Sequence, residues 1–219
     1  MKILSLFCLL LINISFLTSQ DVIEIKNPSF EGEATQGGIE REWELEFWWD
    51  CGFKGQTPPD IHSSNKGFFG VSAQPKHGKT FLGLVTRENN TYECVSQNIE
   101  NPLQKHMTYI IQMALCRSDI YKSQLSNYRN NDNNNDKLYN LIKPIVVQIW
   151  GGNENNDQLE LLAESLPIKN TAWSTYEFNL KPTFNQSLIE IRAYYAPLTN
   201  EPYNGNVLID NLSDIYRID

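Results

Sequence analysis

The sequence predicts an all-β protein built as an antiparallel β-sandwich. Helical periodicity is scarce, and short alternating or apolar segments are separated by turn-forming stretches such as GGNENND and NEPYNGN. Seven segments have the length and composition of strands, and this number at this spacing favours two packed sheets. The seven segments are residues 80–85, 92–99, 108–116, 145–150, 174–180, 187–195 and 206–215.

Alternation within these segments predicts which side of a strand faces the core. In SLIEIRAYY, Glu190, Arg192 and Tyr194 share one face, while Ile189 and Ile191 share the other. Successive strand side chains point to opposite faces of a sheet. One face of this strand is therefore expected in the core, and the other carries charge and an aromatic ring.

The first residues have the layout of a secretory signal peptide. One lysine precedes an apolar run from Ile3 to Phe16, and small polar residues follow it. The run is too short to favour a membrane span. We expect cleavage near Ser19, a single domain over residues 20–219, and a secreted, periplasmic or cell-surface location.

Charge and composition narrow the choice of ligand. The net charge is −8, with 18 lysines and arginines against 26 acidic residues, and nucleic-acid binding requires clustered positive charge. A neutral ligand or a cation suits this chain better. The asparagine-rich residues 126–140 have little apolar surface to bury, so they are predicted to form a loop inserted in the domain.

Three cysteines remain once Cys8 leaves with the signal peptide. Cys51, Cys94 and Cys116 permit one disulfide and one free thiol in an oxidising compartment, or three reduced and buried thiols. The sequence does not decide the pairing. No C-x-x-C pattern is present, which argues against a cysteine metal site.

Most familiar catalytic motifs are absent from the sequence. It contains no G-x-S-x-G, no phosphate-binding loop and no H-E-x-x-H, and its three histidines are scattered. The catalytic candidate is EWELEF, in which a strand would place Glu42, Glu44 and Glu46 on one side, about 7 Å apart. Two carboxylates near that separation serve glycoside hydrolysis. The alternative is a solvated strand face opposite buried Trp43 and Leu45.

The two ends of the domain carry paired motifs. NPSFEGE opens it and GNVLIDNLSDI closes it, a pairing that resembles the galactose-binding-like jelly rolls of carbohydrate-binding modules. The resemblance implies a jelly-roll sandwich with a structural calcium ion held by Glu31 and Asp210. Oxygen ligands from both ends of the domain would bind one ion and so hold the two ends close together. The loop at residues 76–80 is a candidate source of further ligands. Alternatively, the two carboxylates cap strand ends.

The resemblance continues through the middle of the chain. Segments such as WWDCG, HGKTFLGLVTREN, YECVSQNI and IWGG are similar to a group of secreted bacterial proteins built on this jelly roll. Modules of this kind bind sugars on a concave sheet face or in edge loops, using aromatic rings and planar polar side chains. The expected ligand-binding residues are Trp49, Arg87, Glu88, Arg117, Tyr121 and Trp150.

Two of these expectations come with a structural alternative. Arg87 and Glu93 could belong to an internal salt-bridge network, and Trp150 could be a core residue. Trp48 and Trp49 are adjacent, so in a strand one is expected to be buried and the other exposed.

The favoured function is that of an exported, non-catalytic protein that binds a polysaccharide or oligosaccharide. Two alternatives remain at this point. One is a glycoside hydrolase that uses Glu42 and Glu46, and the other is a surface or envelope domain that binds another protein.

Overall fold

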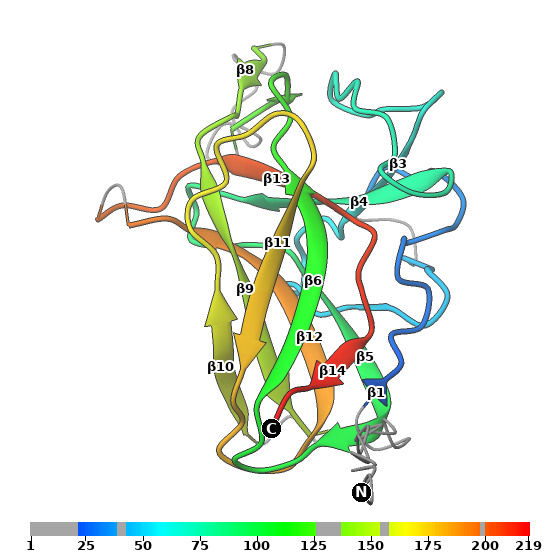
Figure 1. The fold of residues 1–219 in the computed structure, drawn as a ribbon. Coiled ribbons are helices and arrows are strands. Elements are labelled where there is room, and N and C mark those ends of the chain that lie inside the picture. The colour runs from blue at the N-terminus through cyan, green and yellow to red at the C-terminus, as the bar shows by residue number, and fades with distance from the viewer. Residues whose placement is uncertain (1–21, 39–42, 126–136, 154–157, 198–199) are drawn as a thin grey trace, which may run out of the picture.

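The computed structural model describes residues 22–38, 43–125, 137–153, 158–197 and 200–219, and these form a two-sheet antiparallel β-sandwich (Figure 1). The expected signal peptide and most of the asparagine-rich segment lie outside the described residues. No helix within these ranges has the length and apolar character needed to span a membrane.

The first sheet has seven strands in the order β1-β14-β6-β13-β4-β3, with β11 paired to the other edge of β6. Its strands are β1 (Val22–Ile23), β3 (Asp60–Ser63), β4 (Thr80–Thr86), β6 (Tyr109–Cys116), β11 (Ser174–Leu180), β13 (Gly205–Asp210) and β14 (Ile215–Arg217).

The second sheet has five strands in the order β10-β9-β12-β5-β2. A separate pair consists of β7 (Lys122–Ser123) and β8 (Tyr139–Asn140), so the last two residues of the segment 126–140, predicted as a loop, form a strand instead. The five strands are β2 (Trp49–Asp50), β5 (Cys94–Leu103), β9 (Ile145–Gly152), β10 (Leu159–Glu164) and β12 (Gln186–Tyr195).

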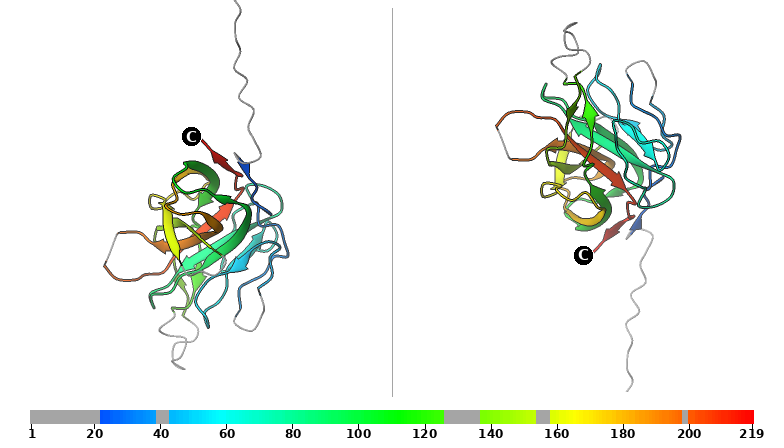
Figure 2. Two further views of the ribbon diagram at one scale, coloured as in Figure 1. Left: turned by 90° about the horizontal axis from the view of Figure 1, so that it is seen from below. Right: turned by 90° about the horizontal axis from the view of Figure 1, so that it is seen from above.

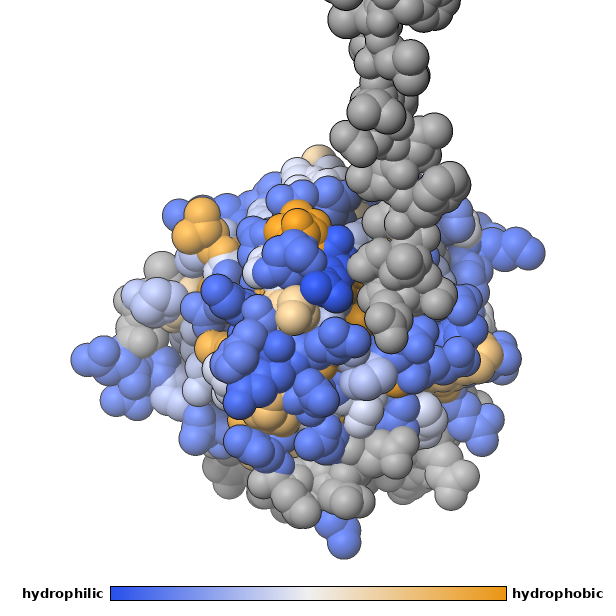
Figure 3. All heavy atoms as spheres, turned by 60° about the horizontal axis from the view of Figure 1, so that its bottom comes forward, coloured by the Kyte–Doolittle hydropathy of each residue, from blue (hydrophilic) through white to orange (hydrophobic). Residues whose placement is uncertain are grey.

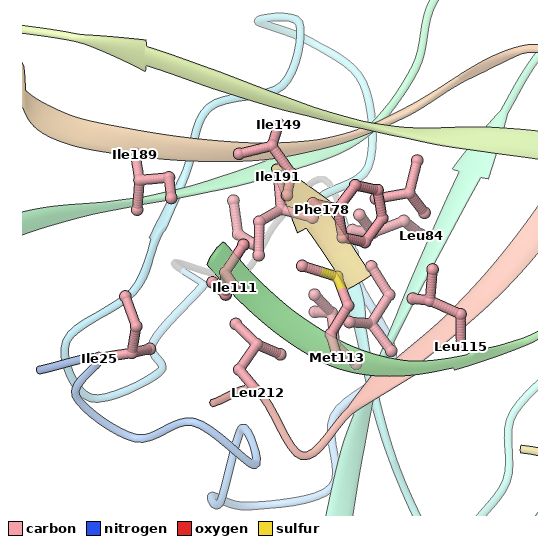
Figure 4. Packing of buried hydrophobic residues seen from close by; sticks show 14 of the residues in the cluster. Ile25, Leu84, Ile111, Met113, Leu115, Ile149, Phe178, Ile189, Ile191 and Leu212 are labelled. Carbon is pink, nitrogen blue, oxygen red and sulfur yellow. The ribbon is translucent and has the colours of Figure 1, made fainter. Parts of the chain in front are cut away.

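The core lies between the two sheets, as the alternation predicts. Ile189 and Ile191 of β12 are fully buried and face Ile111 and Met113 of β6, and Phe178 of β11 packs beside them (Figure 4). Burying each such side chain contributes about 1.5–3 kcal/mol to folding. The polar partners of these residues on β12 point away from the core.

The two ends of the described chain lie together. β1 pairs with β14 in antiparallel register, Ile23 opposite Ile215, at the lower edge of the seven-stranded sheet (Figure 1). Both views of Figure 2 show the blue and cyan segments that precede β4 gathered on one side of the sandwich, opposite the yellow and orange strands. The face turned forward in Figure 3 is mainly hydrophilic, with small separate apolar patches.

Six of the seven predicted strands form as single strands, whereas the segment predicted over residues 206–215 divides into β13, which ends at Asp210, and β14, which begins at Ile215. The opening tryptophan-rich stretch also differs from its prediction. Only Trp49 and Asp50 are in a strand, and residues before them turn back, with the Trp48 N–H donating to the Leu45 carbonyl at 3.0 Å. Phe47 has a φ of 69°, which no extended strand allows. The predicted strand that placed Glu44 and Glu46 on one face is therefore wrong.

Candidate functional site

A row of side chains crosses the outer face of the five-stranded sheet at one level. The strand register pairs Trp49 with Ser96, Ser96 with Glu190, Glu190 with Trp150, and Trp150 with Leu161. Directly paired residues point to the same face, so these five form the cross-strand row. Trp49 is at one end of the row and Leu161 is at the other. Strands are about 4.8 Å apart, so Trp49 and Trp150, three strand spacings away, are separated by roughly 14 Å.

Arg192 lies two residues along β12 from Glu190, on the same sheet face, and is held in a fixed position beside the cross-strand row. The Nε of Arg192 donates to Glu190 at 2.8 Å, its Nη2 also contacts that carboxylate, and its guanidinium lies 4.5 Å from the centre of the Trp150 ring. Trp150 is in turn held by its Nε1, which donates to Gln148 at 2.9 Å. Since Glu190 is 2% exposed, the pair resists solvent screening.

This contact leaves part of the arginine available. Nε and Nη2 of Arg192 are used by Glu190, while Nη1 has no partner among the described residues. A guanidinium held flat by a ring and a carboxylate presents its remaining donors in a fixed direction, which lowers the entropy cost of binding an oxygen ligand.

Aromatic rings flank the arginine on the other side. Tyr92 lies 5.9 Å from the Arg192 guanidinium and makes edge contacts with Phe53 at 4.9 Å and Tyr194 at 5.4 Å. Tyr194 also lines a pocket with a volume of about 390 Å³, whose other lining residues include Glu164 and Tyr195 but neither Arg192 nor Tyr92. Rings next to planar polar groups are suited to the apolar faces and hydroxyls of sugars.

The adjacent tryptophans occupy opposite environments, as predicted. Trp48 is 2% exposed and donates its Nε1 hydrogen to the Asn27 carbonyl at 3.0 Å, whereas Trp49 is 53% exposed at the end of the row. A disulfide between Cys51 and Cys94 joins the segment after β2 to the start of β5 and keeps Trp49 against the sheet. Cys116 is the free, buried thiol that the odd cysteine count permits.

The six predicted ligand-binding residues fall into separate regions. Trp49 and Trp150 lie in the cross-strand row. Arg87 and Tyr121 line a buried pocket on the other sheet, and Glu88 lines a neighbouring one. Arg117 bonds to the backbone carbonyls of Lys169 and Ser118, so Arg87 and Arg117 do not form one site.

Sequence reasoning did not select Glu190, Arg192, Tyr92 or Tyr194 as site residues. The signal was available, because Glu190, Arg192 and Tyr194 were assigned to one polar strand face. What the sequence did not provide was the pairing of β12 with β9, which brings Trp150 under Arg192.

Glu31 and Asp210 both face one loop, residues 76–80. Asp210 Oδ2 accepts the N–H groups of Lys76 and His77 at 2.7 and 2.9 Å, and Glu31 Oε1 accepts the Lys79 N–H at 2.7 Å. The two carboxylates thus meet the same turn from opposite ends of the domain. Their oxygens are donors of the type that calcium prefers, and Glu31 Oε2 has no hydrogen bond among the described contacts.

Of the two carboxylates proposed for glycoside hydrolysis, only Glu46 belongs to the described residues, and it is not in an extended strand. Glu46 lies in the turn between Leu45 and Trp48, and Glu42 lies outside the described residues. The spacing argument depended on one extended strand carrying both, and that strand does not form.

Comparison with known proteins concerns the fold. No protein-family model and no curated protein matches the chain. Among solved structures, the module TmCBM61 in complex with β-1,4-galactotriose is 13% identical, with a TM-score of 0.43, over 89% of this chain and 97% of that one. A xylan-binding CBM22 domain of Xyn10C from Paenibacillus barcinonensis is 14% identical, with a TM-score of 0.45, over 87% and 92%.

An adhesin domain gives a similar result. A cleaved adhesin domain of Lys-gingipain from Porphyromonas gingivalis is 9% identical, with a TM-score of 0.44, over 80% of this chain and 92% of that one. Similarities at this level decide neither the ligand nor the function of this chain.

Proposed function

We propose that the protein binds a glycan through the cross-strand row and does not act on it chemically. The observation that carries this proposal is the exposed Trp49 ring on the same sheet face as Arg192, which Glu190 and Trp150 hold in place. A sugar ring stacks on Trp49, and Arg192 Nη1 donates to a hydroxyl or ring oxygen. The open length of the row suits internal units of a neutral polysaccharide or oligosaccharide.

We also propose that the protein works outside the cytoplasm, with residues 1–19 as its export signal. The Cys51–Cys94 disulfide supports this, because such bonds persist mainly in oxidising compartments. Glu31, Asp210 and the loop at residues 76–80 are proposed to hold a structural calcium ion, which would neutralise two carboxylates that share one turn.

Affinity electrophoresis through gels containing galactan, xylan or mixed β-glucan tests the glycan site. We expect at least one polysaccharide to retard the wild-type protein, and Trp49→Ala and Arg192→Lys to abolish most of the retardation. Tyr216→Ala is the matched control, because Tyr216 is 41% exposed on β14 of the other sheet. Equal retardation of the Trp49 variant and the control would refute the proposed site. Retardation by no polysaccharide would favour a protein ligand.

A further inference from the structure

A second pocket lies on the outer face of the seven-stranded sheet. In β4, Leu82 and Leu84 belong to the core between the sheets, whereas Phe81 and Val85 belong to a smaller apolar cluster on the outer face of the seven-stranded sheet. Loop residues, including Tyr121, cover this cluster. Next to Val85 and Tyr121 they leave a pocket with a volume of about 90 Å³.

Three ionisable groups line this pocket, and each is at least 95% buried. Arg87 Nη2 contacts the Glu93 carboxylate and donates to Thr57 Oγ1 at 2.7 Å. Asp60 accepts the Gly37 N–H at 2.8 Å and the Tyr121 hydroxyl at 3.1 Å. These groups come from β3, the end of β4 and the start of β5, so the fold itself brings them together.

The charges and hydrogen bonds of these three groups are not fully matched within the cluster. It contains two carboxyl groups and one guanidinium, and Arg87 Nη1 is buried without a hydrogen-bond partner among the described residues. Buried polar groups in native proteins are nearly always paired, so an unpaired donor that lines a pocket indicates a binding partner. Burial raises the pKa of Asp60 to about 7 and that of Glu93 to about 8, so near neutral pH these carboxyls both donate and accept hydrogen bonds.

We propose that this pocket binds one hydroxyl-rich unit, a single sugar ring or a polyol of similar size, independently of the cross-strand row. A ligand oxygen accepts from Arg87 Nη1, and ligand hydroxyls pair with Asp60, Glu93 and the Tyr121 hydroxyl. Phe69, stacked on Tyr121 at 4.9 Å, also lines the pocket and offers an apolar wall.

Charge and size decide between ligand classes. An anion would meet two carboxyl groups, and a cation would leave Arg87 Nη1 unpaired, whereas hydroxyl groups satisfy both kinds of partner. The pocket is much smaller than the sites of several hundred Å³ that hold extended ligands, so it excludes a polysaccharide chain and limits the ligand to one small unit. The unit is therefore either a free monosaccharide or polyol, or the end of a glycan.

Titration calorimetry and methyl NMR with D-galactose, D-glucose, D-xylose, L-arabinose and sorbitol test the proposal. We expect at least one compound to bind with 1:1 stoichiometry and to shift the methyl signals of Val85 and Leu141, which line the pocket. Leu161 in the cross-strand row is the reference and should not shift. No binding by any compound, or shifts at Leu161 alone, would overturn the proposal.

Matched variants link binding to the named groups. Tyr121→Phe and Asp60→Asn preserve side-chain size and should weaken binding at least tenfold, whereas Trp49→Ala should leave it unchanged. Binding that survives both pocket variants, or that is lost in Trp49→Ala, would contradict the assignment. Because the methyl shifts are measured on the unmodified protein, a variant that fails to fold does not remove the test.

A third comparison distinguishes the two sources of the ligand. The methyl glycoside and a disaccharide ending in the binding sugar should bind as well as the free sugar if the pocket takes a glycan end. Loss of binding with both derivatives would assign the pocket to free sugars or polyols.

Discussion

Trp48 and Trp49 are adjacent in sequence, but Trp48 is expected to serve stability and Trp49 to serve binding. Trp48 packs in the core at 5.0 Å from the Phe30 ring, while Trp49 projects into solvent. Trp48→Ala should lower the free energy of unfolding by about 3–5 kcal/mol, since it leaves a large cavity and removes a hydrogen bond.

Trp49→Ala should instead change stability by less than about 0.5 kcal/mol, as is usual for exposed positions. Urea unfolding of both variants, with glycan retardation measured in parallel, separates the two roles. A large loss of stability in the Trp49 variant would mean that this ring is structural.

At the scale of elements, the strands were predictable and the segment before β2 was not. Residues 174–180 were predicted as a strand, and β11 has these bounds, with Phe178 and Leu180 buried. Periodicity is sufficient there because the strand is half buried. In residues 43–50, tryptophans, glutamates and leucine alternate equally well, but a turn with a positive φ at Phe47 interrupts the pattern. Only contacts distant in sequence, such as Trp48 with Asn27, favour that turn.

The disulfide determines how firmly β2 is held, because β2 contributes only two residues to the sheet. The bond closes a segment with a sequence separation of 43, for which the loop-entropy model gives about 4 kcal/mol. Replacing Cys51 and Cys94 together by serine should therefore lower the free energy of unfolding by about 2–5 kcal/mol. It should also weaken glycan binding, because Trp49 loses its anchor.

Urea unfolding and affinity electrophoresis of this double variant check both effects. Thiol titration of the unfolded, unreduced protein from residue 20 onward should find one thiol, Cys116. Three thiols would show that the disulfide does not form.

For the whole molecule, the sequence predicted the two-sheet architecture better than it predicted which residues form the candidate ligand-binding sites. The apolar faces of the strands established which residues meet in the core, but a site depends on which strands are neighbours. Arg87 was expected to bind a glycan as a planar polar side chain, but the chain returns to β5 in a way that places Glu93 against it, as the salt-bridge alternative proposed. The contact between Arg192 and Trp150 was not predicted for the same reason, because the sequence does not show which strands are neighbours. Neither pairing is encoded in local alternation.

The buried carboxyl groups predict an unusual dependence of stability on pH. Asp60 and Glu93 have folded pKa values of about 7 and about 8, raised mainly by burial, so between their unfolded and folded values the folded state binds more protons. Stability should therefore fall as pH rises from 6.5 to 8, because the folded state must release protons that the unfolded state has already lost. His62, whose pKa burial lowers to about 4, acts in the opposite direction but only below this window.

Urea unfolding at intervals across this window measures the slope. Asp60→Asn should reduce it, because the asparagine does not titrate. Constant or rising stability from pH 6.5 to pH 8 would show that both carboxylates are ionised in the folded protein.

The proposed calcium ion is a property of the whole chain, because its two carboxylates come from the first and last parts of the domain. A ligand that binds only the folded state stabilises it by about 2.7 kcal/mol at a hundredfold excess over its dissociation constant. Thermal unfolding with calcium and then with excess chelator should show a clear fall in Tm, and Asp210→Asn should remove the difference. Asp214→Asn is the matched control, because Asp214 accepts the Ile25 N–H near the same chain ends but does not face the loop at residues 76–80. If chelation leaves Tm unchanged and metal analysis finds no calcium, the N–H groups of that loop alone neutralise Glu31 and Asp210, and the ends are joined without an ion.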